Sequence, residues 1–343
     1  MKTPLFFCLS LCFVTLSLSA QEPNTSFTVM SYNVENLFDT HNDPLTEDDA
    51  FCPEGEKAWD RKRYEKKIKD LAKVIRSLSP DDYPAVIGLL EVENQKVLEG
   101  LCAQKGLKKA DYRIVHEDSK DPRGIDCALL YRPDRFKYIS HRTIPVRDLS
   151  DPGYLHRDIL YVKGMAPDGR SLHLFVNHWK SRSGGQEETR QKRMYAAMSL
   201  RREMDRLQGT ESDPRIIIMG DFNDEPTNAS VAQGLSAGNK RKNIRMGEHY
   251  NLFYDLHNIE NKGSYCHKGQ WNMLDQIIVS YNLIEQSRGL STSWDGARIF
   301  KEEWMLYESE QYGDWLPSAS YGGPNYYGGP SDHLPVYVQF KLR

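Results

Sequence analysis

Residues 215–223 read Arg215-Ile216-Ile217-Ile218-Met219-Gly220-Asp221-Phe222-Asn223, which is the pattern of a buried strand that ends abruptly in polar residues. Continuous apolar residues over 216–219 predict a strand buried on both faces, and Gly220 allows a tight turn of the backbone. Asp221 and Asn223 are then held at the rim of a rigid sheet. A carboxylate and a carboxamide there can take a proton from water and hydrogen-bond an anionic substrate oxygen, which suits hydrolysis. Taken alone, the pattern also fits an ordinary turn, since Asp and Asn favour turns.

The same design, an apolar strand with a polar cluster at one end, recurs in five other segments. Sheets bring strand ends from distant parts of a chain to one rim, so the clusters are expected to converge into one acidic pocket that contains histidine. Each cluster has an ordinary explanation by itself, but six together favour a functional site. The five clusters are Asn33-Val34-Glu35-Asn36 after residues 27–32, Glu91-Val92-Glu93-Asn94 after 86–90, Asn177-His178-Trp179-Lys180-Ser181-Arg182 after 172–176, Asp275 before 276–279, and Ser331-Asp332-His333 before 334–340.

Together these motifs resemble those of the endonuclease/exonuclease/phosphatase superfamily, which includes deoxyribonuclease I-like enzymes. They occur in the family's order and span residues 27–340, which is nearly all of the chain. The resemblance implies a four-layer α/β sandwich, in which two mixed sheets pack face to face with helices outside. It also implies hydrolysis of phosphoester bonds with a divalent metal, usually Mg²⁺ or Mn²⁺.

The chemistry of the reaction assigns roles to the acidic and amide residues. Attack of water on a phosphodiester adds negative charge to an anionic substrate, so positive charge must be supplied. Mg²⁺ prefers one or two carboxylates plus water, and Glu91, at a buried strand end, is the first expected ligand. Asn33 and Asp332 are the expected second ligands, directly or through water, as the resemblance also implies. Asp221 and Asn223 are expected to orient or deprotonate the attacking water.

The two histidines are expected to serve the phosphate, because imidazole is a poor ligand for Mg²⁺ but a good cationic donor. Asp275 is expected to orient His333, and His178 is expected to approach the phosphate from the opposite side. Relatives give that second histidine an acidic partner, for which Asp126 is the nearest candidate. Arg157 resembles a phosphate-binding arginine of the family, although an ion pair at the rim fits equally well.

The N-terminus predicts export. Residues 1–20 contain Lys2, an apolar run over 5–18 and a Ser-Ala pair before a polar segment, as in a cleavable signal peptide, with an uncleaved anchor as the alternative. We therefore expect a secreted or periplasmic protein without a stable membrane span, with a single catalytic domain over residues 21–343. An oxidising compartment permits disulfides, and the four remaining cysteines, Cys52, Cys102, Cys127 and Cys266, allow three pairings. Cys127, inside an apolar run, is expected to be a buried thiol.

Two helices are expected outside the sheets. Residues 61–78 combine an apolar face with a basic face that is either solvated or in contact with nucleic acid. A second helix is expected over about 187–207, with a stripe formed by Met194, Ala197, Met198, Arg201 and Met204.

An aromatic insertion over residues 291–330 departs from the compact family pattern. It contains three tryptophans, five tyrosines and two Gly-Gly-Pro repeats, at 322–324 and 328–330, shortly before Asp332. The aromatic side chains either stack on nucleobases, at about 1–3 kcal/mol each, or form a small core of their own. In both cases substrate choice is expected to depend on this insertion.

The leading hypothesis is a metal-dependent phosphodiesterase, specifically a nuclease acting on DNA or RNA. The formal net charge of −3 excludes a globally basic protein that coats nucleic acid, so any contact with a phosphate chain must be local. Asn177, Lys180 and Asn223 are expected to contact the substrate, and Lys180 and Arg182 supply local positive charge. The alternatives are hydrolysis of a small or lipid-borne phosphoester, such as an inositol phosphate or sphingomyelin, and an inactive binding module. We expect a monomer with no protein partner.

Overall fold

The computed structural model describes residues 26–343 except 80, 81, 149 and 246. The predicted signal peptide lies outside these residues. Within the described part of the chain, no helix has the length and apolar character needed to cross a bilayer. The four cysteines after residue 50 are all free thiols, and Cys127 is buried as predicted.

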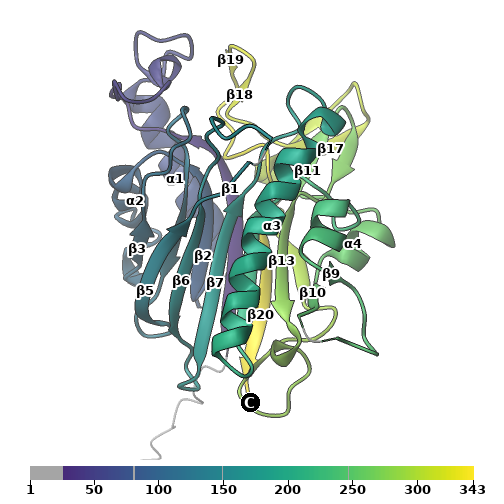
Figure 1. The fold of residues 1–343 in the computed structure, drawn as a ribbon. Helices are drawn as coiled ribbons and strands as arrows, with labels where there is room; N and C mark the ends of the chain where they lie inside the picture. Colours follow the sequence, from purple (N-terminus) through teal and green to yellow (C-terminus); the bar gives the residue numbers. More distant parts are fainter. Residues whose placement is uncertain (1–25, 80–81, 149, 246) are drawn as a thin grey trace, which may run out of the picture.

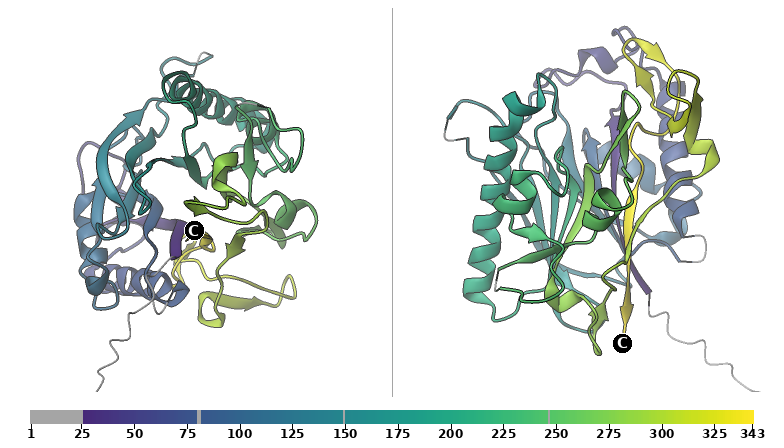
Figure 2. Two further views of the ribbon diagram at one scale, coloured as in Figure 1. Left: turned by 90° about the horizontal axis from the view of Figure 1, so that it is seen from below. Right: turned by 90° about the vertical axis from the view of Figure 1, so that its right-hand side faces the viewer.

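Two seven-stranded mixed sheets pack face to face and form the middle of the molecule (Figures 1 and 2). The first sheet has the order β14-β20-β1-β2-β4-β3, with β15 also paired to β20, and the second has the order β5-β6-β7-β8-β13-β10-β9. The first contains β1 (Ser26–Leu37), β2 (Val86–Val92), β3 (Arg113–His116), β4 (Asp126–Tyr131), β14 (Leu290–Ser291), β15 (Ala297–Ile299) and β20 (Val336–Leu342). The second contains β5 (Lys137–Ile144), β6 (Ile159–Met165), β7 (Ser171–His178), β8 (Ile216–Asp221), β9 (Ala237–Gly238), β10 (His249–Asn251) and β13 (Asp275–Ser280).

Helices cover the outer faces of both sheets and complete the four predicted layers. α1 and α2 pack on the first sheet, and α3 packs on the second (Figure 1). The helices are α1 (Arg61–Leu78), α2 (Gln95–Cys102), α3 (Gln186–Thr210) and α4 (Tyr254–Asn258), with single helical turns at Asp49–Phe51, Lys108–Ala110, Ser230–Gly234, Tyr281–Leu283 and Glu303–Met305. Three small hairpins lie outside the layers: β11 (Tyr265–His267) with β12 (Gln270–Asn272), β16 (Leu306–Ser309) with β17 (Asp314–Pro317), and β18 (Tyr321–Gly322) with β19 (Asn325–Tyr326).

The strand at 216–221 is buried on both faces, as its sequence predicts. Ile217 and Met219 pack into the core between the sheets, whereas Ile216 and Ile218 pack toward α3. Glycine is needed at position 220 for a reason other than the predicted turn, because Gly220 lies inside β8 with a φ of +144°. A Cβ there would lie 1.9 Å from the Asn177 carbonyl oxygen, so glycine is required for the close approach of β7.

Both predicted helices are confirmed, with one correction. The Asp60 side chain accepts a hydrogen bond from the Arg63 backbone N–H and caps α1 at the predicted start. In α3 the predicted stripe is partly wrong, since Met198 is 40% exposed. The face that packs on the second sheet includes Ala196, Leu200 and Leu207 besides the predicted Ala197 and Met204. These positions recur with the helical period, whereas the spacing of the methionines in the sequence did not identify the buried face of α3.

Candidate active site

Three side chains from three strands meet at one rim of the sandwich. The Asn33 amide nitrogen donates hydrogen bonds to Glu91 Oε1 and to Asp221 Oδ2, each at 3.2 Å. Because both carboxylates contact the same nitrogen, they lie close together, although the residues are far apart in the chain. Regular pairing of β1 with β2 ends at Asn33, whose partner is Leu90. Glu91, the residue after Leu90, adopts a φ of +64°. The irregularity turns both side chains toward the rim.

The Asn33 carboxamide has the opposite orientation from the one expected of a metal ligand. Its oxygen accepts the Glu35 backbone N–H at 3.0 Å, and its nitrogen faces the carboxylates. Coordination of a cation through Asn33 would therefore require the amide to turn. Glu91 is held separately, since its Oε2 accepts the Asn36 backbone N–H at 2.9 Å.

Asp221 and Asn223 form a compact pair after β8. Asp221 accepts the Asn223 backbone N–H at 2.8 Å and the Asn223 amide at 3.0 Å. The same amide also donates to the Trp179 carbonyl oxygen at 3.2 Å. Asn223 adopts a φ of +50°, a left-handed conformation that asparagine tolerates better than most residues. Both side chains are thus held in place beside Glu91.

His178 borders this acidic cluster on one side. Its Nε2 lies 3.6 Å from Asp221 Oδ2 and 3.7 Å from Glu91 Oε1, and its buried Nδ1 has no hydrogen-bond partner. The expected pairing with Asp126 is not formed, because Asp126 accepts the Ser119 backbone N–H and faces a different histidine. Burial, followed by the positive charges of Arg157 and Arg123, lowers the pKa of His178 well below its usual value. The imidazole is therefore neutral, which differs from the cationic donor expected.

Arg157 supports the His178 side from within the protein. It is buried and donates to the carbonyl oxygens of His178 at 2.9 Å and Trp179 at 2.6 Å, and to Asp121 Oδ2 at 2.7 Å. Asn177 is also fully buried; it donates to the Met219 carbonyl oxygen and accepts from the Trp179 indole. Both were expected to contact substrate, but their donors are engaged in holding the end of β7. We call the end of β7 with His178 and Arg157 the His178 flank.

The side chains of Lys180 and Arg182 have different surroundings in the structure. Lys180 is half-buried and lines a small hollow together with His178. Burial, with Arg157, Arg123 and Lys192 nearby, lowers the pKa of Lys180. Arg182 instead donates to Asn223, Asn272 and Asn228. Local positive charge toward a substrate thus comes from Lys180 and not from Arg182.

His333 borders the acidic cluster on the other side and is paired as predicted. Its Nδ1 lies 2.7 Å from Asp275 Oδ2, which also accepts the Ser264 hydroxyl at 2.7 Å. The Tyr265 ring stacks on the imidazole at a centroid distance of 4.7 Å. Burial opposes the charged form, but the carboxylates of Asp275 and Asp332 outweigh it and raise the pKa of His333 well above its usual value. This imidazole is the cationic one.

Asp332 is held by Glu35, a residue of the first motif to which the sequence assigned no role. The Glu35 carboxylate accepts the backbone N–H groups of Ser320, Tyr321 and Asp332 at 2.7, 3.1 and 3.1 Å. Its Oε2 also lies 3.9 Å from the ammonium of Lys67, a buried lysine of α1. We call His333, Asp332 and their supports Asp275, Glu35 and Lys67 the His333 flank.

Lys67 connects this flank to the aromatic insertion. Its ammonium donates to Ser320 Oγ at 2.6 Å and to the Pro330 carbonyl oxygen at 2.8 Å. Lys66 donates to the Gly328 carbonyl oxygen, and Lys73 lies 3.5 Å from the centroid of the Trp304 ring. Buried Lys67 and two lysines of the basic α1 face, Lys66 and Lys73, therefore contact the insertion, a role that neither interpretation of that face included.

The insertion divides into packed and exposed aromatic residues. Tyr321 and Tyr326 pack against a small cluster around Phe38 and Trp59, and the β18–β19 hairpin stands near the rim loops in Figure 1. The exposed members are Tyr307, Tyr312, Trp315 and Tyr327. A core of its own and a free aromatic surface thus coexist in one segment.

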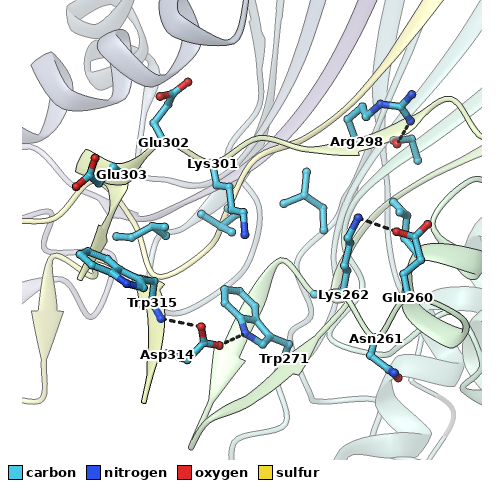
Figure 3. A pocket seen from close by; sticks show the side chains of 16 residues that line it. Glu260, Asn261, Lys262, Trp271, Arg298, Lys301, Glu302, Glu303, Asp314 and Trp315 are labelled. Carbon is cyan, nitrogen blue, oxygen red and sulfur yellow. Dashed lines mark hydrogen bonds and ion pairs between the residues drawn. The ribbon is translucent and has the colours of Figure 1, made fainter. Parts of the chain in front are cut away.

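A hollow of about 840 Å³ lies beside the exposed part of the insertion (Figure 3). Trp271 and Trp315 line it, and Asp314 accepts hydrogen bonds from the Trp271 indole and the Trp315 backbone. Leu334, next to His333, forms part of the wall. Charges of both signs surround it: Glu260, Glu302, Glu303 and Asp314 against Lys262, Arg298 and Lys301. This balance does not favour a phosphate chain.

The acidic cluster has the properties of a cation site. Burial, with the charges of Glu35 and Glu91 and against that of His333, raises the pKa of Asp332 to about 7. Burial, with Asp275 and Glu91 and against His333, raises the pKa of Asp221 to about 6. Carboxylates crowded so closely resist ionisation, and a divalent cation among them would remove this cost. Their oxygen donors suit Mg²⁺ or Mn²⁺.

Comparison with known families agrees with this architecture. The model of the endonuclease/exonuclease/phosphatase family matches residues 28–342. The chain belongs to this family. Members of the family hydrolyse phosphoester bonds and are generally dependent on divalent metals. No curated protein sequence matches the chain.

Solved structures share the fold at low sequence identity. A family protein from Bacteroides thetaiotaomicron is 18% identical, with a TM-score of 0.57 over 93% of this chain and 98% of that one. A mannosyl-6-phosphatase from the same organism is also 18% identical, with a TM-score of 0.56 over 92% and 100%. D. rerio TDP2 with a single-stranded DNA product is 15% identical, with a TM-score of 0.56 over 93% and 100%. These likenesses establish the fold and leave the substrate open.

Proposed function

We propose that this endonuclease/exonuclease/phosphatase family member is a secreted, divalent-metal-dependent phosphodiesterase that preferentially hydrolyses DNA or RNA. The observation that carries the proposal is the meeting of Glu91, Asp221 and Asn33 between a neutral and a charged histidine. A binding module has no need for such a water-activating set. Export rests on the N-terminal sequence, and N-terminal sequencing of the mature protein would test cleavage after residue 20.

Glu91 and Asp332 are the residues that would hold Mg²⁺ or Mn²⁺. When bound, the cation would neutralise charge on the phosphoryl and leaving oxygens. Glu91 is presented by two hydrogen bonds, from Asn33 and from the Asn36 backbone. Asp332 is held in place by the hydrogen bond that its backbone N–H donates to the Glu35 carboxylate. Asn33 holds the carboxylates of Glu91 and Asp221 together, and it becomes a metal ligand only if its amide turns.

Asp221 and Asn223 would position the attacking water. Asp221 has a raised pKa of about 6 and accepts two hydrogen bonds from Asn223, so its carboxylate is both basic and fixed in orientation. His333, charged and held by Asp275, would donate a hydrogen bond to a phosphoryl oxygen. His178, as a neutral imidazole, would donate from one nitrogen only.

A nucleic acid is favoured by the cationic groups on the His178 flank. Arg157, Arg123 and Lys192 all act on Lys180, whose pKa they lower together with burial. Arg157 is engaged internally, but the Arg123 side chain is 49% exposed beside the site. Neighbouring phosphates of a polyanion would place negative charge against these groups.

A small phosphoester is the second candidate, and a specific hollow favours it. A cavity of about 230 Å³ beside Asp332 is lined by Phe51, Lys57 and Tyr321. Its aromatic walls and single lysine would suit a sugar or an inositol ring next to the reacting phosphate. A structural neighbour is a mannosyl-6-phosphatase, which agrees with this class of substrate.

Purified residues 21–343 would be incubated with plasmid DNA, RNA, bis-p-nitrophenyl phosphate, mannose 6-phosphate, inositol phosphates and sphingomyelin. Each substrate would be tested with Mg²⁺, with Mn²⁺ and with chelator. We expect cleavage of nucleic acid that chelator abolishes and that Glu91→Gln lowers about 10³-fold. Glu187→Gln is the matched control, because Glu187 is an exposed acid paired with Arg190 at 3.5 Å. Activity on phosphomonoesters alone would select the second candidate, and activity on none would favour a binding module.

A further inference from the structure

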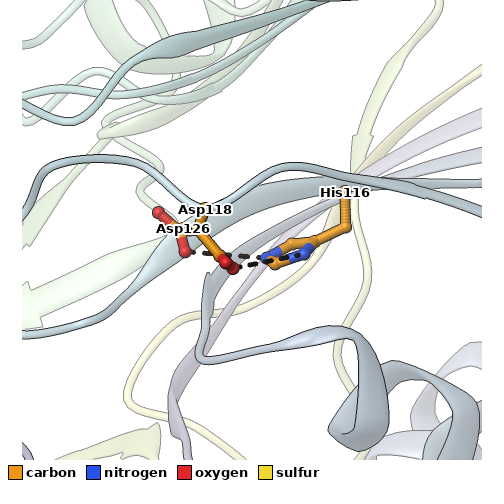
Figure 4. A group of neighbouring side chains, drawn as sticks. All are labelled: His116, Asp118 and Asp126. Carbon is orange, nitrogen blue, oxygen red and sulfur yellow. Dashed lines mark ion pairs between the residues drawn. The ribbon is translucent and has the colours of Figure 1, made fainter. Parts of the chain in front are cut away.

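A second cluster of potential metal ligands lies where β3 leads into β4 (Figure 4). It consists of His116 at the end of β3, Asp126 at the start of β4, and Asp118 in the loop between them. One ligand atom from each residue can be chosen so that all three lie within 4.8 Å of one another. None of the three contributes to the contacts of the candidate active site described above.

The hydrogen bonds of His116 leave one buried nitrogen unexplained. The imidazole is 4% exposed, and its Nε2 has no hydrogen-bond partner. Asp126 Oδ2 lies 3.6 Å from this nitrogen, which is too long for a hydrogen bond. Asp126 itself is only 3% exposed, and its other oxygen accepts the Ser119 backbone N–H at 2.8 Å. A buried polar nitrogen without a partner is unfavourable, so this arrangement calls for a group between the two side chains.

We propose that His116, Asp118 and Asp126 bind a Zn²⁺-class ion that is separate from the catalytic metal. Bonds of about 2.0–2.2 Å in tetrahedral geometry place two ligand atoms roughly 3.4 Å apart. The observed separation of 3.6 Å between His116 Nε2 and Asp126 Oδ2 is close to this value. Asp118 Oδ1 lies 3.9 Å from the other ring nitrogen, so this side chain, which is 85% exposed, has to rotate to reach an ion bound at Nε2. An imidazole combined with two carboxylates favours Zn²⁺ over Mg²⁺ or Ca²⁺.

The ion would brace a loop that supports the active site. Residues 117–125 connect β3 and β4 and carry Asp121, which accepts a hydrogen bond of 2.7 Å from Arg157. Arg157 in turn holds the carbonyl oxygens of His178 and Trp179. A metal that joins both ends of this loop would therefore stabilise the His178 flank. Its role is structural, because His116 and Asp126 lie at the two ends of one loop and none of the three ligands is a catalytic acid.

Zn²⁺ binding would be measured by calorimetry on chain 21–343 carrying Glu91→Gln and Asp332→Asn, which removes the catalytic ligands. We expect one ion per chain. His116→Ala in this background should abolish binding, and Asp118→Asn should weaken it at least about tenfold. Asp118 is 85% exposed, so its replacement leaves the fold intact. His141→Ala is the matched control: both its ring nitrogens already have partners, Tyr138 and Glu117, so Zn²⁺ binding should be unchanged.

Hydrogen exchange supplies a second readout that does not depend on activity. Zn²⁺ should slow exchange of backbone amides within residues 117–125, and Asp118→Asn should remove this protection. Absence of binding in the background protein, or binding that survives both His116→Ala and Asp118→Asn, would overturn the proposal. Because this background is catalytically inactive by design, the outcome is independent of whether the chain is a nuclease.

Discussion

The two flanks of the active site carry the same catalytic side chain in opposite electrostatic settings. His178 lies 3.7 and 3.6 Å from the carboxylates of Glu91 and Asp221 without a hydrogen bond to either, and burial with the charges of Arg157 and Arg123 lowers its pKa. His333 has Asp275 at 2.7 Å and a raised pKa. The flanks also differ in their supports, because Arg157 donates to backbone carbonyl groups on one side and Glu35 accepts backbone N–H groups on the other. Residue type alone therefore does not assign a catalytic role to a histidine, because the charges around the ring set its protonation.

The largest effect is expected from the charged flank. His333→Ala should lower kcat on bis-p-nitrophenyl phosphate about 10³-fold, because it removes the cationic donor to the phosphoryl oxygen. Metal affinity should remain nearly unchanged, since His333 is not a ligand. Steady-state kinetics with a Mg²⁺ titration would check both statements. Loss of metal binding in this variant would mean that the two roles were assigned wrongly.

The support of this flank is expected to affect stability. Lys67→Met should lower the free energy of unfolding by about 3 kcal/mol, because it leaves Glu35 buried without its cation. Denaturant unfolding would measure the change, and proteolysis should show the insertion released near Ser320. Lys69→Met is the control, since Lys69 lies on the same helix but is exposed. Equal stability of the two variants would contradict the proposed anchoring.

The support of the neutral flank should have a smaller effect on catalysis. Arg157→Lys retains the charge but cannot reach both carbonyl groups and Asp121 at once, so His178 loses part of its positioning. We expect kcat to fall about tenfold and KM to change little. A large rise in KM instead would show that Arg157 contacts the substrate after all.

The smallest expected effect is a difference between the two flanks in how the stability of the fold depends on pH. In chelator, the contribution of His333 to stability should be present below about pH 6.5 and lost as pH rises through its higher folded pKa. For His178 the folded pKa is lower than the unfolded one, so stability falls as pH drops below about 6.5. His333→Gln should therefore cost more stability in acid than in alkali, and His178→Gln less. Thermal unfolding across pH would show parallel curves if the two settings were alike.

Local sequence patterns predicted much of the scaffold. The helix at 61–78, the strand buried on both faces at 216–219 and the convergence of the polar clusters follow from periodicity and from the geometry of sheets. The pairing of Asp275 with His333 was also predicted and is present. Each of these depends on a short segment or on a resemblance that preserves strand order.

The supports of the site could not be predicted in the same way. Arg157 and Asn177 were expected to face substrate, but burial directs their donors to backbone oxygens. Glu35 and Lys67 carried a weak signal, an acid inside the first motif and a lysine next to the apolar face of a helix. Their partners, Ser320 and Pro330, are more than 250 residues away, and no local pattern contains such a pairing.

Spacing along the chain was enough to place the strand at 216–219, the helix at 61–78 and the polar residues at the strand ends, because these features depend on local periodicity. The charge states of the two histidines, the internal contacts of Arg157 and the anchoring of the insertion depend instead on the packed structure. Those properties arise from burial and from charges brought together across long separations, and both exist only once the two sheets have packed.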